Sequence, residues 1–167
     1  MVIEGRVHKY GSNIDTDVII SARYLTIADI KEMSTHCFED IDPDFVHRVK
    51  PGDIIVAGSN FGSGSSREWA PIVIKANGVG CVIANSFSRI FFRNAINVGL
   101  PILHCDEAVD GTEPNDVVRV DLASGRIFNI NKNTHFTADL YPDFILKIIK
   151  SGGLIKYTAR RLSGSRN

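Results

Sequence analysis

Ser65, Ser66 and Arg67 follow one another in a glycine-rich stretch, and their side chains are suited to binding an anion. A guanidinium can hold a carboxylate through two parallel hydrogen bonds, and adjacent hydroxyls can donate to the same group. The stretch covers residues 58–71, between apolar runs at 53–57 and 72–76, which predicts a strand, a loop and a helix. The capping-box spacing of Ser65 and Glu68 predicts that the helix begins at the two serines, with its positive dipole end facing the loop. Pro71 belongs in the first turn of a helix, so a regular helix that starts a few residues after Ser65 is the alternative.

Common loop motifs do not match this stretch. No Gly-Lys-Ser/Thr ends the loop, and Arg67 stands where the dinucleotide fingerprint needs a third small residue. No glycine follows Ser66 at the place that a serine nucleophile elbow requires. Two interpretations therefore stay open, a carboxylate or phosphate site and a well-capped helix after a flexible turn.

A second polar stretch, residues 11–17, carries the carboxylates Asp15 and Asp17. Both are candidates for a site, although capping of a turn is the more common use of aspartates in such a place. The five histidines are scattered through the chain and show no metal-ligand spacing.

The three cysteines, Cys37, Cys81 and Cys105, are odd in number and far apart in the chain. This usage predicts reduced thiols in a cytoplasmic protein rather than a disulfide framework. Without a Cys-x-x-Cys pair, we expect this chain to bind no zinc, no iron–sulfur cluster and no other metal by itself.

The bulk composition describes an ordinary globular protein. The chain has 167 residues, 44% hydrophobic and 23% charged, which suits one domain with a sizeable core. Its formal net charge is zero, so electrostatics give no reason to expect binding to nucleic acid or to an anionic membrane. We also expect no membrane span and no signal peptide, because no apolar run is long enough and the N-terminus lacks the required pattern.

The pattern of apolar runs and turn residues predicts alternating strands and helices. We expect strands at 2–10, 18–20, 53–57, 80–84 and 100–104, a hairpin of 117–122 with 126–130, and helices at 28–37, 65–77, 88–97 and 143–150. The last helix should end at Gly152 and Gly153, and a basic tail with Arg160, Arg161 and Arg166 follows. We expect this tail to be a solvated end, with contact to a partner as the alternative. The alternation predicts parallel crossover units in a three-layer α/β domain. The loops 15–27, 58–68 and 85–89 should then meet on one face.

Four blocks of this sequence resemble a known family. Residues 13–20 (Asn-Ile-Asp-Thr-Asp-Val-Ile-Ile), Tyr24-Leu25, residues 62–68 (Gly-Ser-Gly-Ser-Ser-Arg-Glu) and residues 152–155 (Gly-Gly-Leu-Ile) look like those of 3-isopropylmalate dehydratase small subunits. The resemblance covers nearly the whole chain. It implies that residues 1–167 form a single swivelling β/β/α domain, as in the C-terminal domain of aconitase.

The resemblance also implies an activity and a partner. The family's hydro-lyase isomerises 2-isopropylmalate and 3-isopropylmalate by dehydration and rehydration in leucine biosynthesis, in the cytoplasm. It is active only with a separate large subunit that holds a [4Fe-4S] cluster on three cysteines, as a heterodimer or a heterotetramer. Self-association of the isolated small subunit is left open.

The roles of the site residues are likewise implied by the resemblance. Ser65 matches the serine that removes the carbon-bound proton of the dicarboxylate hydroxy acid. Arg67 matches the ligand of a substrate carboxylate, while Ser66 and Gly64 lie beside it as further substrate-binding residues. Asp17 matches an acidic residue that orients site groups from the other loop.

The loop of Tyr24, Leu25, Thr26 and Ile27 resembles the family's substrate-selecting loop. Homoaconitase-like members carry an arginine near Thr26 for a third carboxylate, so its absence favours an apolar substituent, although Arg23 lies close by. A homoaconitase small subunit, a dimethylmalate-type hydro-lyase and a non-catalytic anion-binding assembly module stay open as alternatives. Trp69 is a departure, because many relatives have histidine there.

Overall fold

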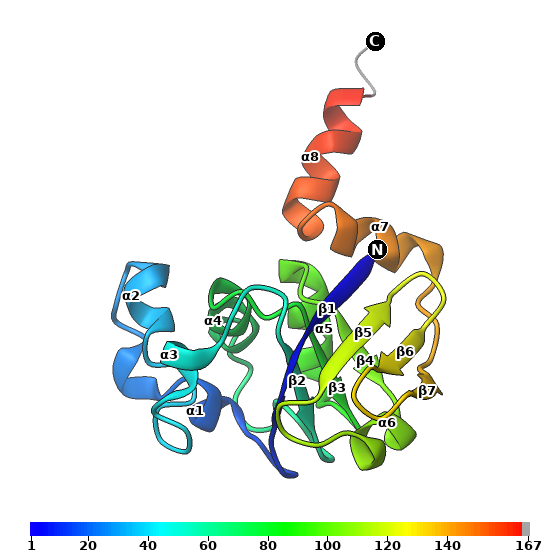
Figure 1. Cartoon of the computed structure of the whole chain (residues 1–167). Helices are drawn as coiled ribbons and strands as arrows, with labels where there is room; N and C mark the ends of the chain where they lie inside the picture. The colour runs from blue at the N-terminus through cyan, green and yellow to red at the C-terminus, as the bar shows by residue number, and fades with distance from the viewer. Residues whose placement is uncertain (165–167) are drawn as a thin grey trace.

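The computed structural model describes residues 1–164 and contains a seven-stranded sheet with the order β4-β3-β2-β1-β5-β6-β7 (Figure 1). Strands β1 to β4 are parallel to one another, and β5 to β7 continue the sheet from β1 in antiparallel pairs. The strands are β1 (Val2–Lys9), β2 (Ile54–Ala57), β3 (Cys81–Ala84), β4 (Ile102–His104), β5 (Val117–Asp121), β6 (Arg126–Asn129) and β7 (Thr134–Thr137).

Helices surround this sheet. They are α1 (Thr16–Ile19), α2 (Ile30–Ser34), α3 (Phe45–Arg48), α4 (Trp69–Ala76), α5 (Arg89–Val98), α6 (Asp106–Gly111), α7 (Asp143–Lys150) and α8 (Leu154–Gly164), with a 3-10 turn at Ala22–Tyr24. Figure 1 shows α1 to α4 on one side of the parallel strands and the antiparallel strands on the other, with α8 standing away from the sheet. None of the helices within residues 1–164 has the length and apolar character needed to cross a bilayer.

Two hydrophobic cores lie on opposite faces of the parallel strands. In β2, Ile55 and Ala57 belong to the core beneath the helices, whereas Ile54 and Val56 belong to a core shared with the antiparallel strands. All four β2 residues are buried, which explains why this strand appears in the sequence as a continuous apolar run. The arrangement of helices, parallel strands and antiparallel strands confirms the predicted three-layer α/β fold.

The crossover units agree closely with the sequence prediction. Ser88 accepts a hydrogen bond from the amide of Phe91 and caps α5, which ends at Gly99 in the left-handed region (φ 75°). The predicted hairpin is also present, because β5 and β6 pair in antiparallel fashion.

Residues 18–20 were predicted as a strand, and this prediction is wrong. Asp15 accepts a hydrogen bond from the amide of Val18 and so caps α1, which includes Val18 and Ile19. The cap outweighs the β-propensity of the branched residues, because it satisfies an amide that a helical turn would otherwise leave without a partner.

The helix begins at Trp69 and not at Ser65, and no side chain caps it, so the later start expected from Pro71 is the one observed. Pro71 accounts for the late start, since a proline without an N–H group fits the first turn but not the interior of a helix. Ser65 and Glu68 therefore do not form a capping box here.

The C-terminal region also differs from the prediction. Gly152 and Gly153 do end α7, but a further helix, α8, follows them directly and includes Arg160 and Arg161. Arg166, the last residue of the predicted basic tail, lies outside the described residues. The short elements α6 and β7 were not predicted from the sequence either.

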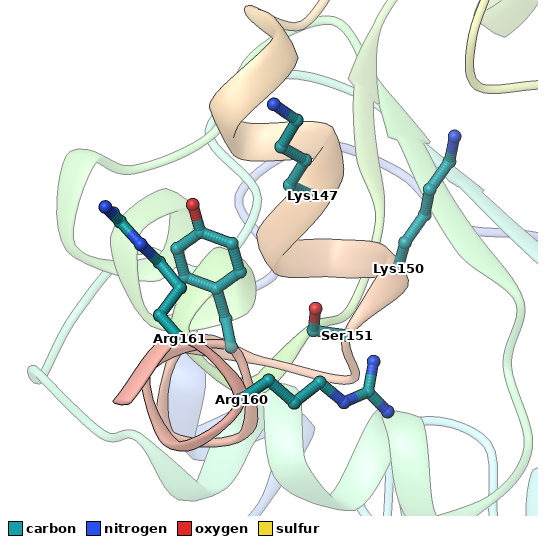
Figure 2. Close-up of a pocket in the computed structure, with 6 residues that line it drawn as sticks. Lys147, Lys150, Ser151, Arg160 and Arg161 are labelled. Atoms are coloured by element: carbon teal, nitrogen blue, oxygen red, sulfur yellow. The ribbon is translucent and has the colours of Figure 1, made fainter. Parts of the chain in front are cut away.

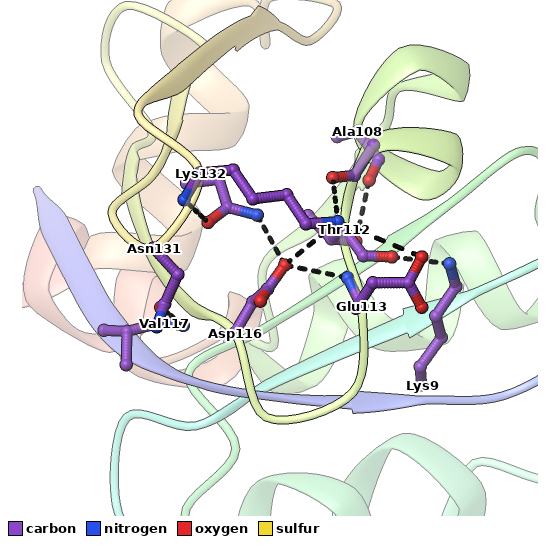
Figure 3. Close-up of polar contacts among 10 residues, drawn as sticks. Lys9, Ala108, Thr112, Glu113, Asp116, Val117, Asn131 and Lys132 are labelled. Atoms are coloured by element: carbon purple, nitrogen blue, oxygen red, sulfur yellow. Dashed lines mark hydrogen bonds and ion pairs between the residues drawn. The ribbon is translucent and has the colours of Figure 1, made fainter.

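A polar network connects the end of β1 to α6 and to the turns around β5 and β6 (Figure 3). Lys9 donates from Nζ to the carbonyl of Thr112 (2.6 Å), and Lys132 donates to the carbonyl of Gly111 (3.0 Å). Asp116 accepts hydrogen bonds from the amide of Glu113 (2.8 Å) and from Asn129 (2.6 Å). Burial acts to raise the pKa of Asp116, but these hydrogen bonds and nearby Lys132 hold it below its ordinary value. The network fixes the end of β1, from which the first site loop departs.

Candidate functional site

Three loops meet at the carboxyl ends of the parallel strands β1, β2 and β3, as predicted. A parallel bridge joins Asp15 to Ser63, with the amide of Thr16 donating to the carbonyl of Ser63 (2.8 Å). A second bridge joins Phe61 to Phe87 and brings the loop after β3 against the glycine-rich loop. Open α/β sheets bind ligands at this edge.

The glycine-rich loop is fixed by close backbone contacts. Gly62 has φ +74°, and a Cβ atom there would lie 2.2 Å from the ring of Phe91. Its amide donates to the carbonyl of Ile14 (2.7 Å), and the hydroxyl of Ser88 donates to its carbonyl (2.5 Å). Only glycine fits this position, which keeps the loop against both of its neighbours.

Ser65 and Ser66 lie exposed on the open face of this loop. The carbonyl of Ser65 accepts hydrogen bonds from the hydroxyl of Thr16 (3.1 Å) and from the amide of Arg67 (2.7 Å). Within residues 1–164, the amides of Gly64, Ser65 and Ser66 donate no hydrogen bond. The Ser65 hydroxyl has no hydrogen-bond partner there either. Gly64 has φ +87°, a conformation that L side chains rarely adopt. Three free amides beside a free hydroxyl can bind an anion.

Arg67 lies across the loop of residues 15–27, the first of the three, and contacts it in two places. Its Nη1 donates to Oδ1 of Asp17 (2.5 Å) and to the carbonyl of Ile20 (3.1 Å). The Arg67 side chain is 15% exposed, whereas that of Asp17 is 56% exposed. The hydrogen bond from Arg67 is the main cause that lowers the pKa of Asp17 below its ordinary value. The guanidinium is thus fixed at one nitrogen, while its Nη2 and Nε have no hydrogen bond within the described part of the chain.

In the loop of residues 24–27, only Thr26 is exposed to solvent. Tyr24, Leu25 and Ile27 are half-buried and pack against the core beneath the helices, while Thr26 is exposed. The ring of Tyr24 stacks on that of His36, with centroids 3.7 Å apart.

Arg23, next to this loop, already has partners. Its Nη2 lies 2.6 Å from Oδ1 of Asp40 and 3.7 Å from Oε2 of Glu39. The guanidinium also lies over the ring of Tyr24, 4.7 Å from the centroid. Its positive charge is therefore matched within the chain.

The cysteines do not suit an iron–sulfur cluster. Cys37 lies in one core and Cys81 and Cys105 lie in the other, and burial raises the pKa of each thiol, that of Cys81 to about 12. Cluster ligands are thiolates, so protonated thiols separated in this way do not fit the group. Within residues 1–164, no three His, Cys, Asp or Glu side chains are placed to hold a metal ion.

The structure adds site contacts that the sequence analysis did not assign. Thr16 holds the Ser65 carbonyl, and Ser88 both caps α5 and binds the carbonyl of Gly62. Asp15 caps α1, which is the capping use weighed above against a role in a site. A cap signal ahead of an apolar helix could have identified Ser88, but nothing in the spacing connects Thr16 to Ser65. Trp69 begins α4 and packs half-buried against the core beneath the helices.

Comparison with known proteins gives the same family for this fold and these loops. The family model of the Aconitase C-terminal domain matches residues 9–108. The 3-isopropylmalate dehydratase small subunit of Caldicellulosiruptor saccharolyticus is 59% identical over 97% of this chain and 94% of its own length. The chain belongs to the family of 3-isopropylmalate dehydratase small subunits. Within this family, the small subunit of Clostridioides difficile is also 59% identical, over 93% of this chain and 95% of its own.

A solved structure supports the assignment at the level of the fold. The crystal structure of 3-isopropylmalate dehydratase from Methanocaldococcus jannaschii has a TM-score of 0.93 to this chain and is 45% identical to it. The match covers 99% of both chains, so the two share the family's fold throughout.

The contact between Arg67 and Asp17 leads to a prediction about the pKa of Asp17. Arg67→Gln should raise the pKa of Asp17 toward its ordinary value, because its principal stabilising hydrogen bond is lost. The same reasoning predicts that the wild-type ion pair persists below neutral pH and is lost only as the pH falls through the lowered pKa of Asp17. Carboxyl carbon shifts followed by NMR against pH measure both.

The carboxyl of Asp121 provides an internal control in the same spectrum. Its pKa is lowered mainly by the hydroxyl of Ser124, so the substitution at Arg67 should leave it unchanged. An unchanged titration of Asp17 in the variant would contradict the described contact.

Proposed function

We propose that this chain acts as one swivelling domain and supplies one half of an active site that interconverts 2-isopropylmalate and 3-isopropylmalate. The observation that carries the proposal is an exposed serine in a loop with free amides, followed two residues later by an arginine whose guanidinium is fixed. The names of the relatives give the reaction, and the geometry of the loops gives the residues suited to it.

Ser65 is proposed as the base that removes the carbon-bound proton of the substrate. Its Oγ accepts this proton as the hydroxyl leaves the neighbouring carbon, and it returns the proton when water adds back in the opposite sense. A serine needs strong stabilisation of its anionic form to act in this way. The free amides of Gly64 and Ser66 and the positive charge of Arg67 provide stabilisation of that kind.

Arg67 is proposed to hold a substrate carboxylate. The Nη1 contact with Asp17 fixes the plane of the guanidinium, and its remaining nitrogens can form a two-point contact with a carboxylate. Asp17 is thus a positioning residue in this proposal, while the hydroxyl and amide of Ser66 and the amide of Gly64 complete the anion site.

The other half of the site is proposed to come from a large subunit, in a heterodimer or a heterotetramer. The relatives are named small subunits, and Ser65 and Ser66 lie open on the surface of this chain. A [4Fe-4S] cluster on that subunit would act as a Lewis acid toward the substrate hydroxyl. The buried thiols of this chain do not fit such a cluster, and they agree with a location in the reducing cytoplasm.

The substrate is proposed to carry an apolar substituent. Thr26 is the exposed residue of the selecting loop, and it is neutral. Arg23 is engaged by Asp40 and Glu39, so it is poorly placed to accept a third carboxylate as well. This favours isopropylmalate over the homoaconitate-type acids, because burying an unpaired carboxylate is costly.

Replacing Ser65 tests the proposed base. In the complex with the large subunit, Ser65→Ala should lower kcat by at least ~100-fold, the lower end for acid–base catalysis. Steady-state assays on isopropylmalate measure this, and melting temperature and subunit pairing should stay close to wild type.

Ser59→Ala is the matched control, because Ser59 is exposed in the same loop and its hydroxyl has no hydrogen bond within residues 1–164. It should keep wild-type turnover. Near-normal turnover of Ser65→Ala would show that this serine is not the base.

Introducing a charge at Thr26 tests the selecting loop. Thr26→Arg should raise kcat/KM for tricarboxylates relative to isopropylmalate by about tenfold or more, the worth of a charge-assisted hydrogen bond. Thr134→Arg, on the edge strand β7, adds the same charge away from the loops and should leave the ratio unchanged. An unchanged ratio in Thr26→Arg would rule out selection by this loop.

A further inference from the structure

The C-terminal arm, defined as residues 147–164, carries a single sign of charge in a chain that is neutral overall. It contains Lys147, Lys150, Lys156, Arg160 and Arg161, and every Asp and Glu of the chain lies at or before Asp143. None of these five cations forms an ion pair within the described residues. The folded body to which the arm is attached therefore has an excess of negative charge.

Helix α8 of the arm turns its apolar side to solvent. Leu154, Thr158 and Leu162 follow one another at intervals of four, and Ile155 lies between them on the same face of the helix. The exposed fractions of Leu154, Ile155 and Leu162 are 39%, 85% and 66%. A helix at the surface of a globular protein normally presents the opposite face to water.

The cationic side of α8 faces α7 across a cleft of about 340 Å³ (Figure 2). Lys147 and Lys150 of α7 and Arg160 and Arg161 of α8 line this cleft, and in Figure 2 their charged ends point outward around it. The hydroxyls of Ser151 and Tyr157 complete the lining, which contains no carboxylate. The rim of the cleft is therefore positively charged and would attract carboxylates or another anion.

The apolar face of α8 and the cationic cleft together indicate that the arm binds a protein surface. A small anion would neutralise the cleft but would leave the apolar face of α8 exposed. An isolated helix of eleven residues is marginal in water, and Tyr157 is the one residue among 154–163 that is even half-buried. A protein surface with both carboxylates and apolar side chains would cover both features.

The chain itself has such a surface in residues 29–44, the acidic segment around α2 and α3. Ile30 and Ile41 are exposed there, at 43% and 47%. The segment contains six carboxylates and only one lysine; Arg23 and Arg48, which flank it, pair with Glu39, Asp40 and Asp42. The carboxylates without an ion pair among the described residues are Asp29, Glu32 and Asp44.

We propose that the arm of one copy docks on the acidic segment of a second copy, and that the contact is made twice about a two-fold axis. Pairing of two arms is disfavoured, because it would bring ten positive charges together. Reciprocal docking instead places cations against carboxylates and buries Ile155 and Leu162. The surface lies outside the proposed catalytic residues, so its test does not depend on the reaction.

Sedimentation of the isolated chain over a range of concentrations tests the proposal. The wild type should form a dimer, and raising NaCl from 50 to 500 mM should weaken it, because the contact joins opposite charges. The double variant Ile155→Ser/Leu162→Ser should dimerise about tenfold or more weakly. Leu140→Ser, a leucine 65% exposed ahead of α7, is the matched control and should dimerise as the wild type does.

A charge exchange identifies the docking surface. Arg161→Glu and Glu32→Lys should each weaken the dimer, and the two together should restore it, because the opposite charges meet again. Salt that strengthens the dimer would overturn the proposal in favour of contact between two arms. A monomeric wild type would overturn it as well, whether the arm then binds the large subunit or only inorganic phosphate added as a probe.

Discussion

The ion pair between Arg67 and Asp17 joins two loops that are fifty residues apart in the chain. Each loop leaves the end of a different parallel strand, and without a contact between them the guanidinium could take many positions relative to Ser65. The Asp17 carboxylate and the Ile20 carbonyl both bind Nη1 and fix the guanidinium over the first loop. The proposed anion site depends on this contact, because a two-point contact with a carboxylate requires a guanidinium held in one plane.

The rest of the fold fixes the position of these loops relative to one another. Parallel pairing of β1, β2 and β3 places the loop origins side by side, and Gly62 keeps the glycine-rich loop tight against Phe91. The network around Lys9 and Asp116 fixes the end of β1. Ser65 nevertheless lies on an open face, and an enzyme that must exclude water from its chemistry needs another surface over it. The proposed large subunit would supply that surface.

Elements with strong local signals could be predicted from the sequence. The buried strand β3 appeared as a short apolar run, and helix α5 had both its Ser88 cap and its Gly99 stop. The prediction failed where a tertiary or side-chain contact outweighed the local signal. Asp15 caps α1, so that Val18 is helical and not extended. Helix α8 was missed because two glycines appeared to end the regular structure, although a new helix begins directly after them.

The candidate site was predictable only in part. Residue types and spacing made Ser65, Ser66 and Arg67 candidates for an anion site, beside the alternative of a capped helix. The roles expected for Asp17 and for the loop with Thr26 came from the resemblance to a family. The contact of Thr16 with Ser65 has no sequence signal, because two loops far apart in the chain make it.

The most direct test of the account is an anaerobic assay on 2-isopropylmalate with three samples: this chain, the large subunit carrying its cluster, and the two combined. The account predicts turnover in the combined sample alone, with iron retained by the large subunit. Robust turnover by this chain without its partner would contradict the claim that it supplies only half of the site.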